Sequence, residues 1–221
     1  MENRPDTQPA TPVVSSDVLR KMEENARSLF LASIALKQDI VQGGHLEGLS
    51  KMAALCVESL CQGGKIMFCG NGGSAADAQH LAAELTVRLR SQVNREGIPA
   101  IVLATDTSAI TACANDYSFD FLYERMVRTL GRPGDVLLGI TTSGKSPNIL
   151  KALHAAREMG ISTLGFLGGD GGPALPLCDL SFVPPSKETG RIQESHITAG
   201  HALMEMIEDI LIGMDRVKLL P

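Results

Sequence analysis

The sequence has no apolar run close to the roughly 20 residues needed to cross a bilayer, and no signal-peptide core near its first residue. We therefore expect a cytoplasmic protein that does not act in a membrane. It also has no excess of basic residues, because its formal net charge is -5. This charge balance disfavours a general nucleic-acid binder, so we expect no nucleic-acid partner.

Cysteine pairs with metal-binding spacing are also missing. The chain has five cysteines, none of them in a CxxC pair, and most lie among apolar residues. An odd number without such spacing disfavours a structural zinc site and a disulfide framework, and it predicts reduced, buried thiols. The GxGxxG fingerprint of dinucleotide-binding proteins is absent as well.

The N-terminal part of the chain is predicted to be helical. Residues 1–16 have the composition of a disordered tail, and residues 17–221 form one domain without an internal linker. Asp17 is suited to cap a long helix that ends at Gly43-Gly44, and a second helix covers residues 45–62. Because no strand separates these helices, we expect a helical hairpin that packs beside a later sheet or forms an oligomer interface.

After residue 64 the pattern alternates between strands and helices. The strands are short, apolar and not alternating, as is typical of a parallel sheet that is covered on both faces. The fold class is therefore α/β, a doubly wound three-layer αβα sandwich around a mostly parallel five-stranded sheet. The expected strands are 65–69, 98–104, 135–140, 161–167 and 180–183, and the expected helices are 75–90, 107–114, 119–130, 147–159 and 191–216.

A small-residue loop follows the first strand and precedes a helix. The free backbone N–H groups of such a loop and the helix dipole favour an anion, although the same residues also suit a plain tight turn. On the following helix His80 and Glu84 lie four residues apart, so they share one face and could bind a metal ion or transfer a proton. The loop consists of Asn71, Gly72, Gly73 and Ser74.

A second candidate phosphate site follows the third strand. Its hydroxyl groups lie just before a helix that begins at Pro147, where they can donate to one phosphate. The stretch GITTSGKS also matches the P-loop pattern, but the match begins inside the strand and Pro147 removes a backbone donor. We therefore disfavour a nucleotide site and keep this loop as a candidate phosphate site. The hydroxyl residues are Thr141, Thr142, Ser143 and Ser146.

The last helix and its lead-in carry Gln193, His196 and His201. Single histidines on an apolar helix usually have structural roles. Together with His80 and Glu84, however, they predict a zinc site with an open position. Gln193 and His201 are eight residues apart, about 12 Å along a regular helix. Either Gln193 lies at a frayed helix start, or two protomers contribute different ligands.

Four stretches, in order, carry a family resemblance. They are GNGGSAADAQHLAAEL, TDTSAITACAND, GDVLLGITTSGKSPN, and RIQESH followed by His201. From about residue 17 onward the chain resembles the sugar isomerase (SIS) domain family, and within it the enzymes that isomerise seven-carbon sugar phosphates. The resemblance implies a homotetramer with active sites near subunit interfaces. It implies conversion of sedoheptulose 7-phosphate into D-glycero-D-manno-heptose 7-phosphate by a zinc-assisted enediolate mechanism, early in ADP-heptose and lipopolysaccharide core synthesis.

The resemblance also implies roles for single residues. Glu84 and His201 match the acid/base pair, and one Zn²⁺ per subunit is bound by His80, Glu84, Gln193 and His201. Glu84, Gln193 and Arg88, one helical turn after Glu84, also match substrate-binding positions. The other matching substrate-binding positions are Asn71, Gly72, Gly73, Ser74, Asn115, Asp116, Thr141, Thr142, Ser143 and Ser146. Lys145 departs from the family, which often has a small polar residue there.

Two other functions occur on the same fold. Some relatives are tetrameric scaffolds that bind the replication initiator protein, but that branch lacks the complete set of metal ligands that this chain retains. Sugar-phosphate-sensing regulators usually carry an added DNA-binding domain. Only some 60 mainly helical residues without a basic face precede the first strand here, which disfavours that function.

Overall fold

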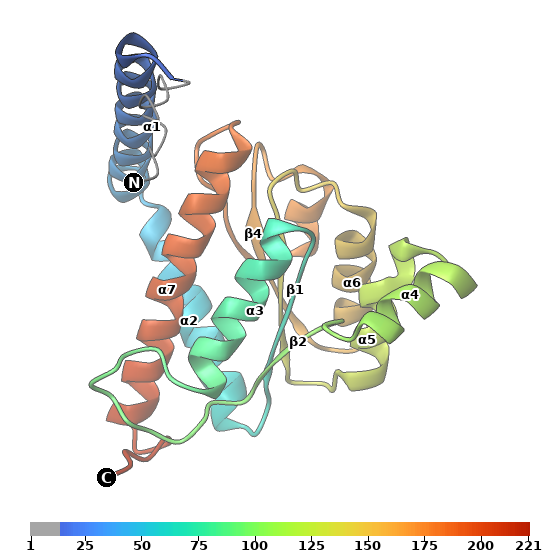
Figure 1. The fold of residues 1–221 in the computed structure, drawn as a ribbon. Helices are drawn as coiled ribbons and strands as arrows, with labels where there is room; N and C mark the ends of the chain where they lie inside the picture. Colours follow the sequence, from blue (N-terminus) through green and yellow to red (C-terminus); the bar gives the residue numbers. More distant parts are fainter. Residues whose placement is uncertain (1–13) are drawn as a thin grey trace, which may run out of the picture.

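Two helices come first in the structure, a computed structural model that describes residues 14–221 (Figure 1). Helix α1 spans Ser16–Gln42 and α2 spans His45–Cys61. The side chain of Ser15 accepts a hydrogen bond from the backbone N–H of Val18, so Ser15 caps α1. The predicted cap, Asp17, instead lies in the first turn. Residues 1–13 of the predicted tail lie outside the described residues.

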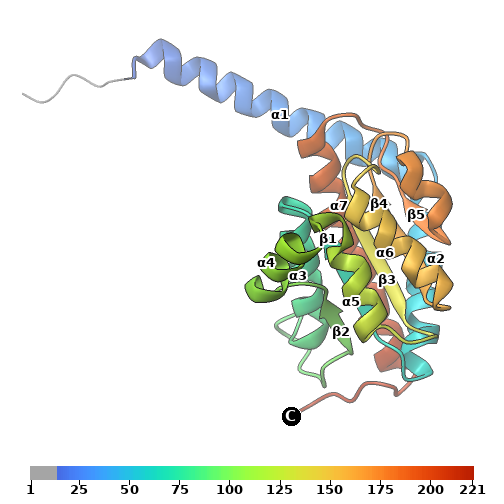
Figure 2. The same cartoon turned by 90° about the vertical axis from the view of Figure 1, so that its right-hand side faces the viewer.

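Most of α1 projects away from the rest of the domain (Figure 2). Only Leu36 and Ile40, near its end, are buried. Helix α2 has six buried residues and packs against the last helix and the last strand. The N-terminal helices are therefore anchored mainly through α2.

The sheet has five strands, all parallel, in the order β2-β1-β3-β4-β5. Phe68 at the centre of β1 pairs with Val102 of β2 and with Leu138 of β3. This arrangement confirms the predicted α/β class. The strands are β1 (Ile66–Gly70), β2 (Ala100–Val102), β3 (Val136–Thr141), β4 (Ser162–Leu167) and β5 (Leu180–Phe182).

Two hydrophobic cores cover the two faces of the sheet. Ile66 and Phe68 of β1 point into the core formed with α2, α3 and α7, and Met67 and Cys69 point into the core formed with α4, α5 and α6. Alternate strand residues face opposite sides, and both sides are buried, which explains the continuous apolar strands. The further helices are α3 (Gly73–Thr86), α4 (Thr107–Asp116), α5 (Leu122–Leu130), α6 (Pro147–Glu158), α7 (Thr189–Gly213) and the 3-10 helices η1 (Phe119–Phe121) and η2 (Gly172–Leu177).

Helix α3 is shorter than predicted. It ends at Thr86 and not at residue 90, so Arg88 lies beyond the helix and not one helical turn after Glu84. A tertiary contact accounts for this early end. The side chain of Arg95, in the loop that follows, donates hydrogen bonds to the backbone carbonyls of Glu84 and Leu85.

All five cysteines are free, as predicted, and three of them are buried. Burial raises the pKa of Cys56 and of Cys178 to about 12, so both thiols stay protonated at neutral pH. No helix of residues 14–221 combines the length and the apolar character that a membrane span needs.

Candidate active site

The loops after β1 and β3 lie next to each other at the carboxyl ends of the strands. From there α3 turns to one face of the sheet and α6 to the other, which is where doubly wound folds bind ligands. The side-chain amides of Asn71 and Asn148 join the two loops in a reciprocal pair, with N–O distances of 2.9 and 2.8 Å. Asn148 is almost completely buried, so this pair links the two loops from within the fold.

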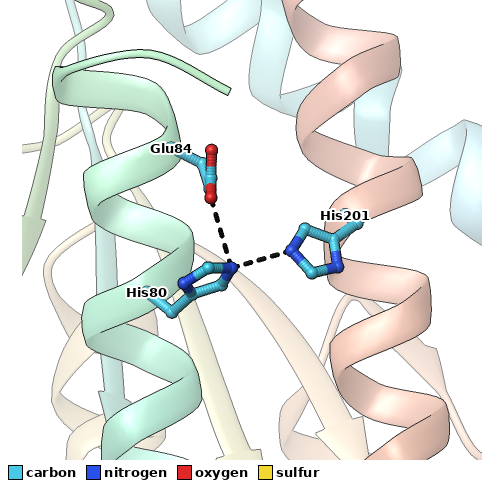
Figure 3. Close-up of side chains that lie close together, drawn as sticks. All are labelled: His80, Glu84 and His201. Carbon is cyan, nitrogen blue, oxygen red and sulfur yellow. Dashed lines mark hydrogen bonds and ion pairs between the residues drawn. The ribbon is translucent and has the colours of Figure 1, made fainter. Parts of the chain in front are cut away.

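Three side chains from two helices meet farther along α3 (Figure 3). Nε2 of His80 lies 2.8 Å from Nε2 of His201 on α7 and 3.2 Å from Oε1 of Glu84. The two imidazole rings are nearly perpendicular, with centroids 4.9 Å apart. The side chain of His80 is 48% exposed and that of Glu84 is 15% exposed, so the group opens to solvent on one side.

These three residues fit a metal ion. One ligand atom from each lies within 4.8 Å of the others. Oε2 of Glu84 is buried and has no hydrogen-bond partner among the described residues. Two imidazoles and one carboxylate form the donor set of catalytic zinc sites, which keep a fourth position open. The structure thus brings together three of the four predicted ligands, all within one chain.

Gln193, the fourth predicted ligand, lies in the second turn of α7 and not at a frayed start. Its amide lies against the first turn of α3, because a Cβ built on Gly73 would be 2.2 Å from Nε2 of Gln193. It also contacts the carboxylate of Asp77, which lies three residues before His80. Burial raises the pKa of Asp77. Gln193 therefore lies between the loop and the His80 group, and its metal ligation stays a prediction.

Sequence reasoning missed Asp77 and Asn148. Asp77 is buried, and its Oδ2 has no hydrogen-bond partner among the described residues. Its spacing of three residues from His80 puts both on one helical face, a signal that the sequence contains. The buried position of Asn148 became apparent only with the packing of α6.

The hydroxyl residues after β3 form a compact cluster. Oγ1 of Thr141 lies 3.1 Å from Oγ of Ser146 and 3.4 Å from Oγ of Ser143. Ser146 is the N-cap of α6, yet its side chain makes no capping hydrogen bond and remains available to a ligand. Gly139, the first residue of the P-loop pattern, lies inside β3 against Ile149, as predicted from the pattern's position. The cluster suits a phosphate at a helix N-terminus.

In the loop after β1, Gly72 adopts a φ of +55°, a conformation that favours glycine. Ser74 is buried. Asn115 and Asp116 lie exposed at the end of α4, where the amide of Asn115 donates to the carboxylate of Asp116 at 2.8 Å. Helix α4 packs on the sheet face opposite to α3 and α7. Substrate binding by these residues, and by the exposed Arg88, stays a prediction.

His196 belongs to the core. Its Nε2 lies 2.9 Å from the carbonyl of Leu167, and burial lowers its pKa to about 4. The neutral ring packs beside Phe166 and Phe182. It therefore has the structural role that a histidine on an apolar helix usually has.

Comparison with known proteins places this geometry in a family. The family model of the SIS domain matches residues 29–168. The chain belongs to the SIS domain family. The phosphoheptose isomerase of Chlorobaculum parvum is 50% identical over 192 residues, which cover 86% of this chain and 91% of that protein. The phosphoheptose isomerase of Paramagnetospirillum magneticum is 49% identical over 191 residues, covering 86% and 94%.

Solved structures agree with this SIS assignment. The phosphoheptose isomerase of Neisseria gonorrhoeae is 41% identical, with a TM-score of 0.79 over 85% of this chain and 99% of that chain. That of Francisella tularensis is 33% identical, with a TM-score of 0.81 over 85% and 98%. The chain is accordingly an aldose–ketose isomerase of the SIS family.

Proposed function

We propose that this isomerase converts sedoheptulose 7-phosphate into D-glycero-D-manno-heptose 7-phosphate in the cytoplasm, as an early step of ADP-heptose and lipopolysaccharide core synthesis. The observation that carries the proposal is the convergence of His80, Glu84 and His201 in a chain about half identical to phosphoheptose isomerases. Residues that bind the phosphate and residues that transfer protons lie in separate places, as a sugar with its phosphate and its carbonyl at opposite ends requires.

The phosphate end of the substrate fits the loops. The hydroxyls of Thr141, Ser143 and Ser146 can donate to phosphate oxygens at the start of α6. Backbone N–H groups at the start of α3, beside Gly72, where an added Cβ would meet nothing within 4 Å, can do the same. His80 is seven residues after Gly73, about 10 Å along the axis of α3, so the sugar would extend along this helix.

Glu84 is placed to move the proton. Isomerisation removes a proton from the carbon next to the carbonyl and returns it to the neighbouring carbon, which suits a carboxylate. Oε1 of Glu84 faces His80, whereas Oε2 has no partner among the described residues, so the two oxygens can serve a metal ion and the substrate separately. His201 would exchange protons with the sugar oxygens. A zinc ion held by His80, Glu84, Gln193 and His201, one per subunit, would stabilise the negative charge that develops on those oxygens.

We further propose that the chain is a homotetramer in which α1 is covered by other copies. Most of the large apolar side chains of α1 are exposed, up to 74% for Phe30, and a helix with so many exposed apolar side chains is typical of an interface. Arg191, two residues before Gln193, donates to the carbonyl of Leu29 at 2.6 Å, which places α1 close to the start of the site. The exposed side chains are Val18, Leu19, Met22, Leu29, Phe30, Leu31, Ile34 and Val41.

Turnover of sedoheptulose 7-phosphate by the purified protein, before and after removal of metal by a chelator, tests the proposal. We expect chelation to abolish turnover and zinc to restore it. His201→Gln should lose activity in the presence of zinc, and the exposed His154→Gln on α6 is the matched control that should keep it. Absence of turnover by folded, zinc-loaded protein would refute the substrate assignment. Turnover that chelation leaves unchanged would refute the metal site.

A further inference from the structure

A buried arginine binds the end of α3, together with the backbone N–H of Ile98. The side chain of Arg95 is completely buried. Its Nη2 donates to the backbone carbonyl of Glu84 at 2.7 Å, and its Nη1 donates to that of Leu85 at 2.8 Å. The last turn of a helix leaves such carbonyls without intrahelical partners, and the helix dipole favours a cation there. Arg95 therefore fixes the backbone of the residue whose carboxylate belongs to the site.

The same guanidinium is bound to α7 through Glu208, which is also completely buried. Oε1 of Glu208 accepts from Nε of Arg95 at 2.5 Å, and Oε2 accepts from Nε of Arg90 at 2.7 Å. Glu208 is seven residues after His201, two turns along the same face of α7. One ion pair thus connects the backbone of Glu84 to the helix that carries His201.

Apart from this ion pair and the polar contacts of the site residues themselves, α3 and α7 pack through apolar side chains near Gly200. Gly200, next to His201, packs so closely on Leu81 that an added Cβ would lie 2.7 Å from its Cδ1. Apolar contacts have no preferred direction, whereas a guanidinium and a carboxylate bond only in defined geometries. A buried ion pair often adds little stability over an apolar pair of the same volume.

We infer that Arg95 and Glu208 are positioning residues, which hold α3 and α7 at the separation that lets His80, Glu84 and His201 bind one metal ion. The inference rests on the proposed metal site and deepens it. It assigns part of the site's metal affinity to two side chains that touch neither metal nor substrate.

The test uses the full-length protein with Arg95→Met and Glu208→Leu combined, so that neither charge is left buried alone. Arg90 keeps Glu205 and Asp209 as partners. Zinc affinity is measured by competition with a chromophoric chelator, and ligand geometry by the visible absorption of bound Co²⁺. We expect zinc affinity to fall about 10- to 100-fold, as for other residues that orient metal ligands, and the Co²⁺ spectrum to change.

The matched control is Lys65→Met combined with Asp135→Leu. It removes a second ion pair, 2.5 Å long, that joins the residues preceding β1 and β3. We expect this variant to lose stability but to keep its zinc affinity within about twofold, because distant sites act independently.

A folded Arg95→Met/Glu208→Leu variant with the zinc affinity and Co²⁺ spectrum of the unchanged chain would overturn the inference. If that variant does not fold, Glu208→Gln replaces it, because glutamine keeps the shape and an acceptor for Arg95. Glu208→Gln should also lower zinc affinity, but by a smaller factor than the double substitution. An unchanged affinity would count equally against the inference. Failure of the unchanged chain to bind zinc would instead refute the proposed metal site.

Discussion

Two carboxylates in this molecule, the buried Asp135 and the half-buried Glu84, have opposite surroundings. Asp135, at the amino end of β3, accepts hydrogen bonds from the backbone N–H groups of Lys65 (3.0 Å) and Arg132 (2.8 Å) and from the ammonium of Lys65 (2.5 Å). Glu84 has one oxygen 3.2 Å from His80 and one without any partner among the described residues. Both oxygens of Asp135 thus accept hydrogen bonds within the fold, whereas one oxygen of Glu84 is available to a ligand.

Cavity size does not identify the candidate site, because a large cavity lies beside Asp135 and not beside Glu84. A cavity of about 560 Å³ lies at the amino ends of the strands, where Lys65, Arg132 and Asp135 are among its lining residues. Lys65 and Arg132 in its wall already donate to both oxygens of Asp135, whereas Oε2 of Glu84 in the His80 group has no hydrogen-bond partner among the described residues. At Glu84 a buried oxygen without a partner in residues 14–221 marks the candidate site where cavity volume does not, whereas the unpartnered Nδ1 of His196 lies in the core.

The largest expected effect comes from the available carboxylate. Glu84→Gln keeps the shape of the side chain but removes its charge and its capacity to accept a proton. We expect kcat to fall by about 10²- to 10⁴-fold, the usual contribution of a general base. The measurement is the rate of sedoheptulose 7-phosphate isomerisation at saturating zinc. Unchanged kcat in a folded Glu84→Gln variant would eliminate the proposed role.

Asp135→Asn should show the reverse pattern. Loss of one partner of a buried ion pair leaves Lys65 without its counter-charge, so the free energy of unfolding should fall by about 3 to 5 kcal/mol. Urea unfolding measures this change. The kcat should stay close to that of the unchanged chain, and a large drop in a folded variant would mean that the two carboxylates are not functionally separate.

His196 provides a third buried group, whose effect depends on pH. Its pKa is lowered to about 4 in the folded state, against about 6.5 when unfolded. The contribution of neutral His196 to the free energy of unfolding is therefore fully present above pH 6.5. It is lost as the pH falls toward 4, because only the unfolded state gains the proton. This loss reaches about 3 kcal/mol. Urea unfolding between pH 7 and 4 should show a shallower loss for His196→Gln, whereas parallel curves would contradict this assignment.

The smallest expected effect is at Gly73. A methyl group there would lie 2.2 Å from Nε2 of Gln193 and displace its amide. Because a small displacement of a positioned group is costly in catalysis, we expect Gly73→Ala to lower kcat/KM about tenfold or more. The control is Gly190→Ala, where an added Cβ meets nothing within 4 Å. Equal kcat/KM values for the two variants would show that Gln193 needs no such placement.

The sequence predicts much of the fold because its signals are local. The apolar runs of the five strands and the double glycines after α1 and α2 place most boundaries within two residues. The predicted end of α3 was wrong because residues 87–90 suit a helix, whereas Arg95 and the backbone N–H of Ile98, both from the following loop, bind the carbonyls at its end. The 3-10 helix η2 was missed because its glycines and prolines are typical of a loop.

In the candidate site, too, local sequence patterns predict some contacts and tertiary packing decides the others. Spacing alone predicts that His80 and Glu84 share a face, and the structure agrees. That His201 joins them depends on how α7 packs against α3, which no local pattern contains. The contact of Gln193 with Gly73 has the same origin. Residue types thus predict the chemistry, whereas the meeting of the groups depends on tertiary packing.

The position of His80 and His201 in the chain has a thermodynamic consequence. The two residues are 121 positions apart in sequence. An ion bound to both would join two distant parts of the folded chain, and unfolding would release it because the unfolded chain has no preformed site. At a free concentration 100 times its Kd, such an ion would add about 2.7 kcal/mol to the free energy of unfolding. Metal supply would then raise the fraction of molecules that is folded as well as the rate of turnover.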